Sequence, residues 1–197
     1  MSQAPPDVSV ARGADYVGAP WFGTFALDFV TPQLQRGAAA WFAKRGVRTM
    51  PARSDLTIRD LKMLLPNLSI IEIVPSDPVR YRVRLMGSVL DEMVAPMTGR
   101  FIDEAVPAHF AQKWSSQWLP AIDERKPMRA VGRVEFAGRR WYVAESLYAP
   151  LAFDGETPDM LMVAAYYHSV DTADGATSDV AASLAAQVNA QTATLVS

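Results

Sequence analysis

Residues 69–86, SIIEIVPSDPVRYRVRLM, hold two β-type segments separated by a turn sequence. Residues 69–74 are rich in β-branched side chains, whereas residues 81–86 alternate apolar and basic side chains, as half-buried strands do. Residues 75–78 read Pro-Ser-Asp-Pro, a composition typical of turns. We therefore predict an antiparallel hairpin with one apolar face and one arginine-rich face.

Helices are predicted on both sides of this hairpin along the chain. A short helix at residues 58–65 follows Thr57, a good N-cap, and Pro66 closes it. A longer helix at residues 108–118 carries Phe110, Trp114 and Trp118 at four-residue steps, which places all three on one face. Pro120 should bend or end this helix, because proline removes a backbone hydrogen bond.

Three further strands are predicted at residues 128–136, 140–150 and 160–169, with a tight turn at residues 137–139. The chain thus has two strands, one helical block and three strands. Parallel strands need a crossover connection for every pair, and only one helical block is available. The pattern therefore predicts an α+β fold in which the last three strands form a meander.

A single domain is expected over residues 31–170. Residues 1–30 contain scattered Pro and Gly without periodicity and are predicted to be an extended arm whose aromatic side chains dock onto the domain or a second subunit. Residues 171–197 are predicted to be an acidic, Ala-rich tail, either a frayed helix or disordered. A helix should start after Thr31 and stop at Gly46, and its apolar face offers these dimer-interface candidates: Leu34, Ala38, Trp41 and Phe42.

Composition excludes several classes of protein. The 197 residues include 19 Lys or Arg, 21 Asp or Glu, no Cys and only two His, with a formal net charge of −2. Disulfides, Cys-ligated metals and thiol nucleophiles are therefore excluded. No apolar run approaches the roughly 20 residues of a membrane span, and no secretory signal is visible, so a cytoplasmic location is expected. Residues 36–62 carry seven basic and two acidic side chains, but aromatic interleaving for base stacking is missing, so we expect no nucleic-acid partner.

Residues 51–104 resemble the opening of a bacterial PAS-domain family of stand-alone proteins, mostly alphaproteobacterial. The similarity lies in Pro51-Ala52-Arg53, Leu64-Leu65-Pro66, the two strands up to Gly87, and Thr98-Gly99-Arg100, and it continues through Tyr148-Ala149-Pro150-Leu151. The resemblance implies a five-stranded antiparallel sheet with helices on one face, arranged around a cavity of small-molecule size. It also implies a sensory or interaction module.

The resemblance fixes no ligand, so candidate pocket residues come from the side-chain pattern. Apolar side chains converge from the second strand, the long helix and the fourth strand, with Glu145 on the face of its apolar neighbours. If buried, Glu145 needs a partner such as Arg84 or Arg133. The same aromatic stripe fits a solid core, and periodicity does not distinguish the two. The candidate ligand-binding residues are Tyr81, Val83, Leu85, Trp114, Trp118, Tyr142 and Glu145.

Cofactor chemistry is poorly supported by the sequence. Haem needs an axial ligand, and only His109 and His168 are available. Covalent flavin photochemistry needs a cysteine, so we expect neither haem nor flavin, and no metal. Recognisable catalytic motifs are missing, and we therefore predict no enzyme; a lone carboxylate base at Asp91, Asp103 or Glu145 is the enzymatic alternative.

The sequence thus predicts a sensory or regulatory module that binds a small molecule in its core and acts through protein contact, as a homodimer. The alternative is a dimerisation or interaction protein without a ligand. Neither the ligand nor the signalling partner follows from the sequence.

Overall fold

The computed structural model describes residues 21–134, 142–170 and 178–196. The predicted turn at residues 137–139 and the end of the strand expected at 128–136 lie outside these ranges. The strands are β1 Trp21–Thr24, β2 Leu68–Val74, β3 Arg80–Met86, β4 Met128–Arg133, β5 Tyr142–Leu151 and β6 Met160–Ser169. The helices are α1 Pro32–Arg45, α2 Ile58–Leu61, α3 Ser88–Met93, α4 Ile102–Ala105, α5 Ala108–Glu124 and α6 Asp179–Val196, with 3-10 turns at Arg53–Asp55 and Leu65–Asn67.

The strands form one antiparallel sheet in the order β1-β4-β5-β6-β2-β3. The α+β class is confirmed, as are the hairpin β2–β3 and the meander β4–β5–β6. The sheet has six strands where five were predicted, because part of the expected arm forms β1 and pairs with β4 from Trp21↔Gly132 to Thr24↔Arg129. Without β1, the backbone groups on that side of β4 would form an exposed sheet edge.

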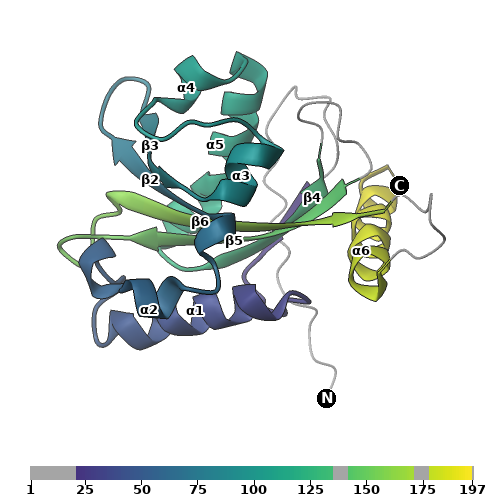
Figure 1. Ribbon diagram of the computed structural model, residues 1–197, viewed down its shortest axis with the longest axis horizontal. Helices are drawn as coiled ribbons and strands as arrows, with labels where there is room; N and C mark the ends of the chain where they lie inside the picture. Colours follow the sequence, from purple (N-terminus) through teal and green to yellow (C-terminus); the bar gives the residue numbers. More distant parts are fainter. Residues whose placement is uncertain (1–20, 135–141, 171–177, 197) are drawn as a thin grey trace.

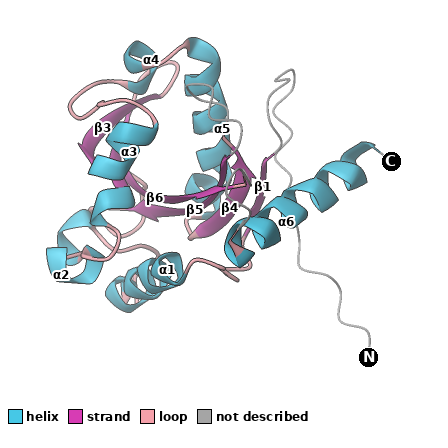
Figure 2. Ribbon diagram, turned by 45° about the vertical axis from the view of Figure 1, so that its right-hand side comes forward, coloured by secondary structure: helices cyan, strands magenta, loops and turns pink. Residues whose placement is uncertain are grey.

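Helices cover both faces of the sheet (Figure 1). The inner face is defined here as the one that packs against α3, α4 and α5, and the outer face as the one that packs against α1 and α2. Figure 2 shows α6 on the side of the sheet where α1 lies, next to β1 and β4. The prediction of helices on one face plus an N-terminal helix therefore describes only part of the arrangement.

Helix α6 brings the expected C-terminal tail into the domain. Leu184 and Val188 are buried against Phe22 of β1, Val131 of β4 and Val143 of β5. These side chains form a small core separate from the two larger clusters on the inner and outer faces. The packed unit therefore extends past the predicted limits of residues 31 and 170 at both ends. No helix in the described part of the chain is long and apolar enough to cross a membrane.

Local signals set both ends of α1 and the start of α2. Pro32 stands in the first turn of α1 and Gly46, at φ 60°, follows its last residue, as predicted. Thr57 and Asp60 form a capping box at α2. Of the two effects predicted for Pro120, a bend or an end of the helix, the end does not occur, because α5 continues to Glu124, where Arg125 in the left-handed conformation closes it.

The four dimer-interface candidates lie mainly inside the chain. Leu34, Ala38 and Trp41 are at most 1% exposed and belong to the core between α1 and the outer face of the sheet. The Trp41 indole N–H also donates to the carbonyl of Pro150 on β5, at 2.7 Å. Only Phe42 is exposed, at 42%. Three of the four predicted interface residues thus pack on the sheet of their own chain, and Phe42 is the one of the four at the surface.

Substitution at Trp41 should consequently affect folding of the single chain. We expect Trp41→Ala to lower the free energy of unfolding by roughly 3–5 kcal/mol, because it removes a buried aromatic side chain and leaves a cavity. The neighbouring variant Phe42→Ala is the control and should cost much less, since Phe42 is partly exposed. Urea denaturation measures both; equal losses would contradict this placement of α1.

Candidate functional site

A cavity of about 160 Å³ lies between the inner face of the sheet and the helices α3–α5. Cavities of roughly 150 Å³ in other proteins accept one aromatic ring, so this space suits a small organic molecule. The lining residues are Trp21, Ser69, Ile71, Val83, Met86, Leu90, Val94, Met97, Ile102, Phe110, Lys113, Trp114, Gln117, Trp118, Ala130, Val131, Gly132, Arg133, Val134, Ala144, Ser146, Tyr148, Val163, Ala165 and Tyr167.

The cavity exists because large side chains on α5 face small ones on the sheet. Helical spacing turns Phe110, Trp114 and Trp118 toward the strands. The opposite wall has Ala130 and Gly132 on β4 and alanines on β5 and β6, whose side chains fill little of the space. Because large side chains on the helix face small ones on the sheet, a void remains between them. Of the two alternatives, a pocket and a solid core, the structure has the pocket.

Polar groups also face the cavity, and several are buried. The Tyr148 hydroxyl donates to Oε1 of Gln117 at 3.2 Å. Burial raises the pKa of Tyr148, so the phenol stays protonated at neutral pH. The Ser69 hydroxyl donates to the carbonyl of Leu85 at 2.9 Å. Lys113 is only 8% exposed although it carries an ammonium group. A mostly apolar wall with a few polar groups is the usual composition of a ligand site.

The structure brings some of the predicted pocket residues together. Val83, Trp114 and Trp118 line the cavity. Tyr81 lies behind them, with its ring edge-on to Trp118 at 5.3 Å between centroids, and burial raises the pKa of its phenol. Tyr142 is partly exposed on β5 and is not among the lining residues.

Leu85 and Glu145 do not reach the cavity, which corrects the predicted pocket. Leu85 packs with the outer-face core, whereas Val83, two residues earlier, faces inward. The cause is a register shift: Ile71 pairs with Val83 but Ile70 pairs with Leu85, so β3 has one extra residue at this point. A bulge of this kind reverses the side-chain alternation, and Met86 takes the cavity position instead.

Glu145 is fully buried on the other side of β5, with Arg129 of β4 as its partner. Nε of Arg129 donates to Oε1 of Glu145 at 2.6 Å, and Arg129 is itself only 2% exposed. The predicted need for a partner was right, but Arg84 and Arg133 were wrong as the partner. Arg84 lies 3.8 Å from Glu72 on the surface, and Arg133 donates to Asn189 of α6.

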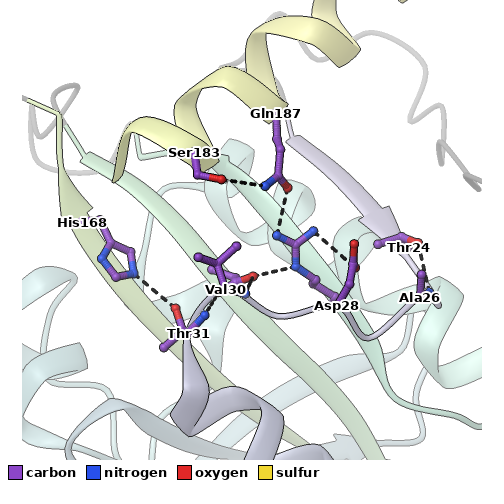
Figure 3. A network of polar contacts seen from close by, with 10 residues as sticks. Thr24, Ala26, Asp28, Val30, Thr31, His168, Ser183 and Gln187 are labelled. Carbon is purple, nitrogen blue, oxygen red and sulfur yellow. Dashed lines mark hydrogen bonds and ion pairs between the residues drawn. The ribbon is translucent and has the colours of Figure 1, made fainter. Parts of the chain in front are cut away.

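This ion pair anchors two helices to the sheet. The carboxylate of Glu145 accepts the backbone N–H groups of Val30 at 3.0 Å and Thr31 at 2.8 Å, directly before α1. Nη2 of Arg129 donates to Oε1 of Gln187 on α6 at 2.9 Å. Figure 3 shows Asp28 and Thr31 of the segment before α1 and Gln187 of α6 in one network of polar contacts. The Thr31 side chain makes no cap hydrogen bond, and Glu145 instead holds the two backbone N–H groups that directly precede the helix.

Sequence reasoning missed the buried polar residues. Lys113 and Gln117 are one turn apart on the helix face of Phe110, Trp114 and Trp118, so polar residues on an apolar stripe were a visible signal. Arg129 gave no comparable signal, because arginines alternate with apolar residues at many exposed strand positions. Trp21 was assigned to the arm, but its strand places it in the cavity wall.

The groups considered for cofactor or base chemistry lie elsewhere. His168 is on β6 with Nε2 3.3 Å from the Thr31 hydroxyl, and His109 is exposed at the start of α5. Asp103 pairs with Arg80 at the surface, and that contact lowers its pKa. Neither histidine lines the cavity, and nor does Asp91, Asp103 or Glu145. Within the described ranges, no three His, Asp or Glu side chains form a possible metal site.

No protein-family profile matches the sequence, and no curated protein does. Two solved structures are similar in part. The LOV protein of Rhodobacter sphaeroides has 12% identity and a TM-score of 0.38, covering 69% of this chain and 66% of that one. An RNA-binding light-oxygen-voltage receptor has 12% identity and a TM-score of 0.40, covering 72% and 38%. This chain thus spans less than two thirds of either protein, and likeness at this level bears on neither function nor ligand.

The Arg129–Glu145 pair should contribute strongly to the free energy of unfolding. We expect Glu145→Gln to lower the free energy of unfolding by roughly 3–5 kcal/mol, because the Arg129 guanidinium stays buried without its counter-charge. The double variant Arg129→Met/Glu145→Leu should be more stable than the single one, since no charge is left buried. Urea denaturation measures all of these variants.

The control is Glu104→Gln, which removes an exposed partner of Arg80 and should leave the denaturation midpoint unchanged. A Glu145→Gln variant as stable as the wild type would show that the pair contributes nothing to folding.

His168 should make stability depend on pH near neutrality. Burial lowers the pKa of its imidazole, while the charge of Glu145 acts in the opposite direction. The unfolded chain therefore binds this proton at a higher pH than the folded chain, and stability is lost as pH falls below about 6.5. We expect His168→Gln to flatten the stability profile between pH 5 and 7. His109→Gln is the control and should keep the wild-type slope; equal slopes in all three proteins would refute the assignment.

Proposed function

We propose that this protein is a sensory or regulatory module that binds a small organic molecule in the cavity under α5 and signals through protein contact. The supporting observation is the cavity itself, with apolar walls on α5 and the sheet and buried polar groups at Gln117, Tyr148 and Lys113. The PAS resemblance of residues 51–104 implies a module with an interior of this kind.

Binding rather than catalysis is favoured by the position of the acidic groups. Glu145 is held by Arg129 and two backbone N–H groups on the outer face, and Asp103 is paired at the surface. A carboxylate base has to reach the substrate in a plausible pose, and none of the three candidates lines the cavity.

A change in the cavity has a short physical route to the surface. Val131 of β4 lines the cavity and also belongs to the small core beneath α6, and Arg133 lines the cavity while it donates to Asn189 of α6 at 3.2 Å. A ligand that shifts β4 would therefore alter how α6 packs on the sheet. We propose that the surface around α6 contacts a protein partner.

We propose that a homodimer uses a surface other than the apolar face of α1. Leu34, Ala38 and Trp41 are inside the chain, so a second copy cannot dock on them. Exposed apolar side chains lie instead at Phe42, Val47 and Phe153. The interaction module without a ligand is the alternative function, and it would use surfaces of this kind alone.

Native mass spectrometry of the freshly purified protein, compared with its denatured mass, tests the proposed function. We expect a stoichiometric extra mass, or a rise in melting temperature with at least one member of a small-molecule library. An absorbance scan from the ultraviolet through the visible reports whether a bound molecule is a chromophore. A bare mass together with an unresponsive library would favour the interaction module.

The variant Ala144→Leu tests whether the ligand binds in this cavity. Ala144 lines the cavity opposite Gly132 of β4, so the added branched side chain enters this space and we expect loss of the bound mass and of the thermal response. Ala39→Leu on the exposed side of α1 is the matched control and should bind as the wild type does. Equal binding by both variants would place the ligand elsewhere.

A further inference from the structure

Gln117 on α5 carries a hydrogen-bond donor that the described part of the chain leaves without an acceptor. Its side chain lines the cavity, and the residue is only 8% exposed. Oε1 accepts the Tyr148 hydroxyl at 3.2 Å, whereas Nε2 donates to no acceptor within residues 21–134, 142–170 and 178–196. The large majority of buried polar side-chain atoms in proteins do have a hydrogen-bond partner. An unpartnered amide N–H at the wall of a cavity therefore points to an acceptor on a bound molecule.

The phenol of Tyr148 fixes which end of this amide is left for a ligand. Burial raises the pKa of Tyr148, so the phenol keeps its one proton at neutral pH. It donates that proton to Oε1 of Gln117, the acceptor end of the amide. The reversed amide would leave the phenol proton without this acceptor. Nε2 is therefore the end of the Gln117 side chain that remains to donate.

The walls around Gln117 are mainly apolar. Trp114, three residues before it on α5, and Phe110, two turns before it, line the same cavity. Ile71 of β2 and Val83 of β3 line the wall from the sheet. A volume of about 160 Å³ accepts one ring or a short branched chain. The body of a bound molecule therefore contacts hydrocarbon, and the Gln117 amide offers a place for one polar atom.

One amide donor matches one uncharged oxygen. A carbonyl oxygen that leaves water needs a hydrogen bond in return, and the N–H of an amide supplies it. A carboxylate has two oxygens with about four acceptor sites and a charge, for which one neutral donor does not compensate. Lys113, four residues earlier on α5, already has an interaction of its own, so its ammonium group is not free to take that charge.

We infer that the cavity binds a small molecule with a carbonyl oxygen, such as a ketone, an aldehyde or an amide, and that Nε2 of Gln117 donates to this oxygen. The body of the molecule is a single ring or a short branched chain. This inference rests on the proposed ligand-binding function and adds the chemical class of the ligand. Gln117 is the specificity residue, because it separates a carbonyl compound from a hydrocarbon of the same shape.

Isothermal titration of the full chain with paired probes tests the inference. Acetophenone is paired with α-methylstyrene and cyclohexanone with methylenecyclohexane, so that a C=CH₂ group replaces the carbonyl with little change of shape. Hydration alone favours binding of the hydrocarbon, so the measured quantity is the ratio of the two affinities. We expect Gln117→Met to weaken binding of the carbonyl probe about tenfold and to leave the hydrocarbon unaffected, as the loss of one buried hydrogen bond predicts. The same ratio in wild type and variant would overturn the inference.

The control is Gln112→Met, which makes the same substitution at an exposed position of α5. It should keep the wild-type ratio. Because Gln117→Met leaves the Tyr148 phenol without its acceptor, the double variant Gln117→Met/Tyr148→Phe removes both polar groups and is used if the single variant does not fold. Binding of the hydrocarbon by either variant shows that the cavity itself is intact.

Infrared spectroscopy of acetophenone with an isotope-labelled carbonyl tests the contact directly. A hydrogen bond to the oxygen lowers the C=O stretching frequency. We expect a lower frequency for the probe bound to the wild type than for the probe bound to Gln117→Met, and the wild-type value for Gln112→Met. Identical frequencies in all three proteins would contradict a hydrogen bond from Gln117.

The two proposals fail in distinguishable ways. If molecules without a carbonyl group bind in the cavity while the carbonyl probes do not, the ligand class is wrong and the proposed function stands. If no molecule binds and the native mass is bare, both are wrong.

Discussion

The buried pair of Arg129 and Glu145 connects more of this structure than any other polar contact described in it. The carboxylate accepts two backbone N–H groups at the start of α1, and the guanidinium holds Gln187 of α6. Burying a charge costs several kcal/mol by general estimates. The attraction within the pair offsets this desolvation cost only where the other hydrogen-bonding atoms of both side chains also have partners. The segments that fill them here are the ones that precede α1 and form α6, so the sheet, the arm and the C-terminal helix are joined at one point.

The inner face of the sheet follows a different constraint, which is the match of side-chain sizes. Helix α5 carries large aromatic side chains, and β4, β5 and β6 oppose them with alanine and glycine. Interiors are normally packed to the density of organic crystals, so a space of about 160 Å³ departs from the rule. Its wall also holds polar side chains, among them Gln117 and Tyr148, which hydrogen-bond to each other. Together, the void and these polar groups favour a binding role for this face.

Several parts of the fold could be predicted because their signals are local. The alternation in residues 81–86 indicated a strand, Thr57 with Asp60 indicated a helix start, and the single helical block excluded a parallel sheet. The predicted pocket was right for Val83, Trp114 and Trp118 as lining residues but wrong for Leu85 and Glu145. Strict alternation was assumed along β3, and the extra residue opposite Ile70 and Ile71 reverses it. A bulge depends on the pairing of two strands and is not encoded by the period of one.

The amino-acid sequence by itself determined the α+β class, the helix faces and the absence of cysteine chemistry, because propensity, periodicity and composition belong to individual segments. Only the tertiary structure decided that Trp21 forms a sixth strand, that Leu34, Ala38 and Trp41 pack inward, and that Arg129 pairs with Glu145. Each of these contacts joins segments that are distant in the sequence, some by more than a hundred residues. Each segment alone is compatible with several packing partners. The choice among partners is made by burial and by the need to satisfy buried charges, which act only once the whole chain is folded.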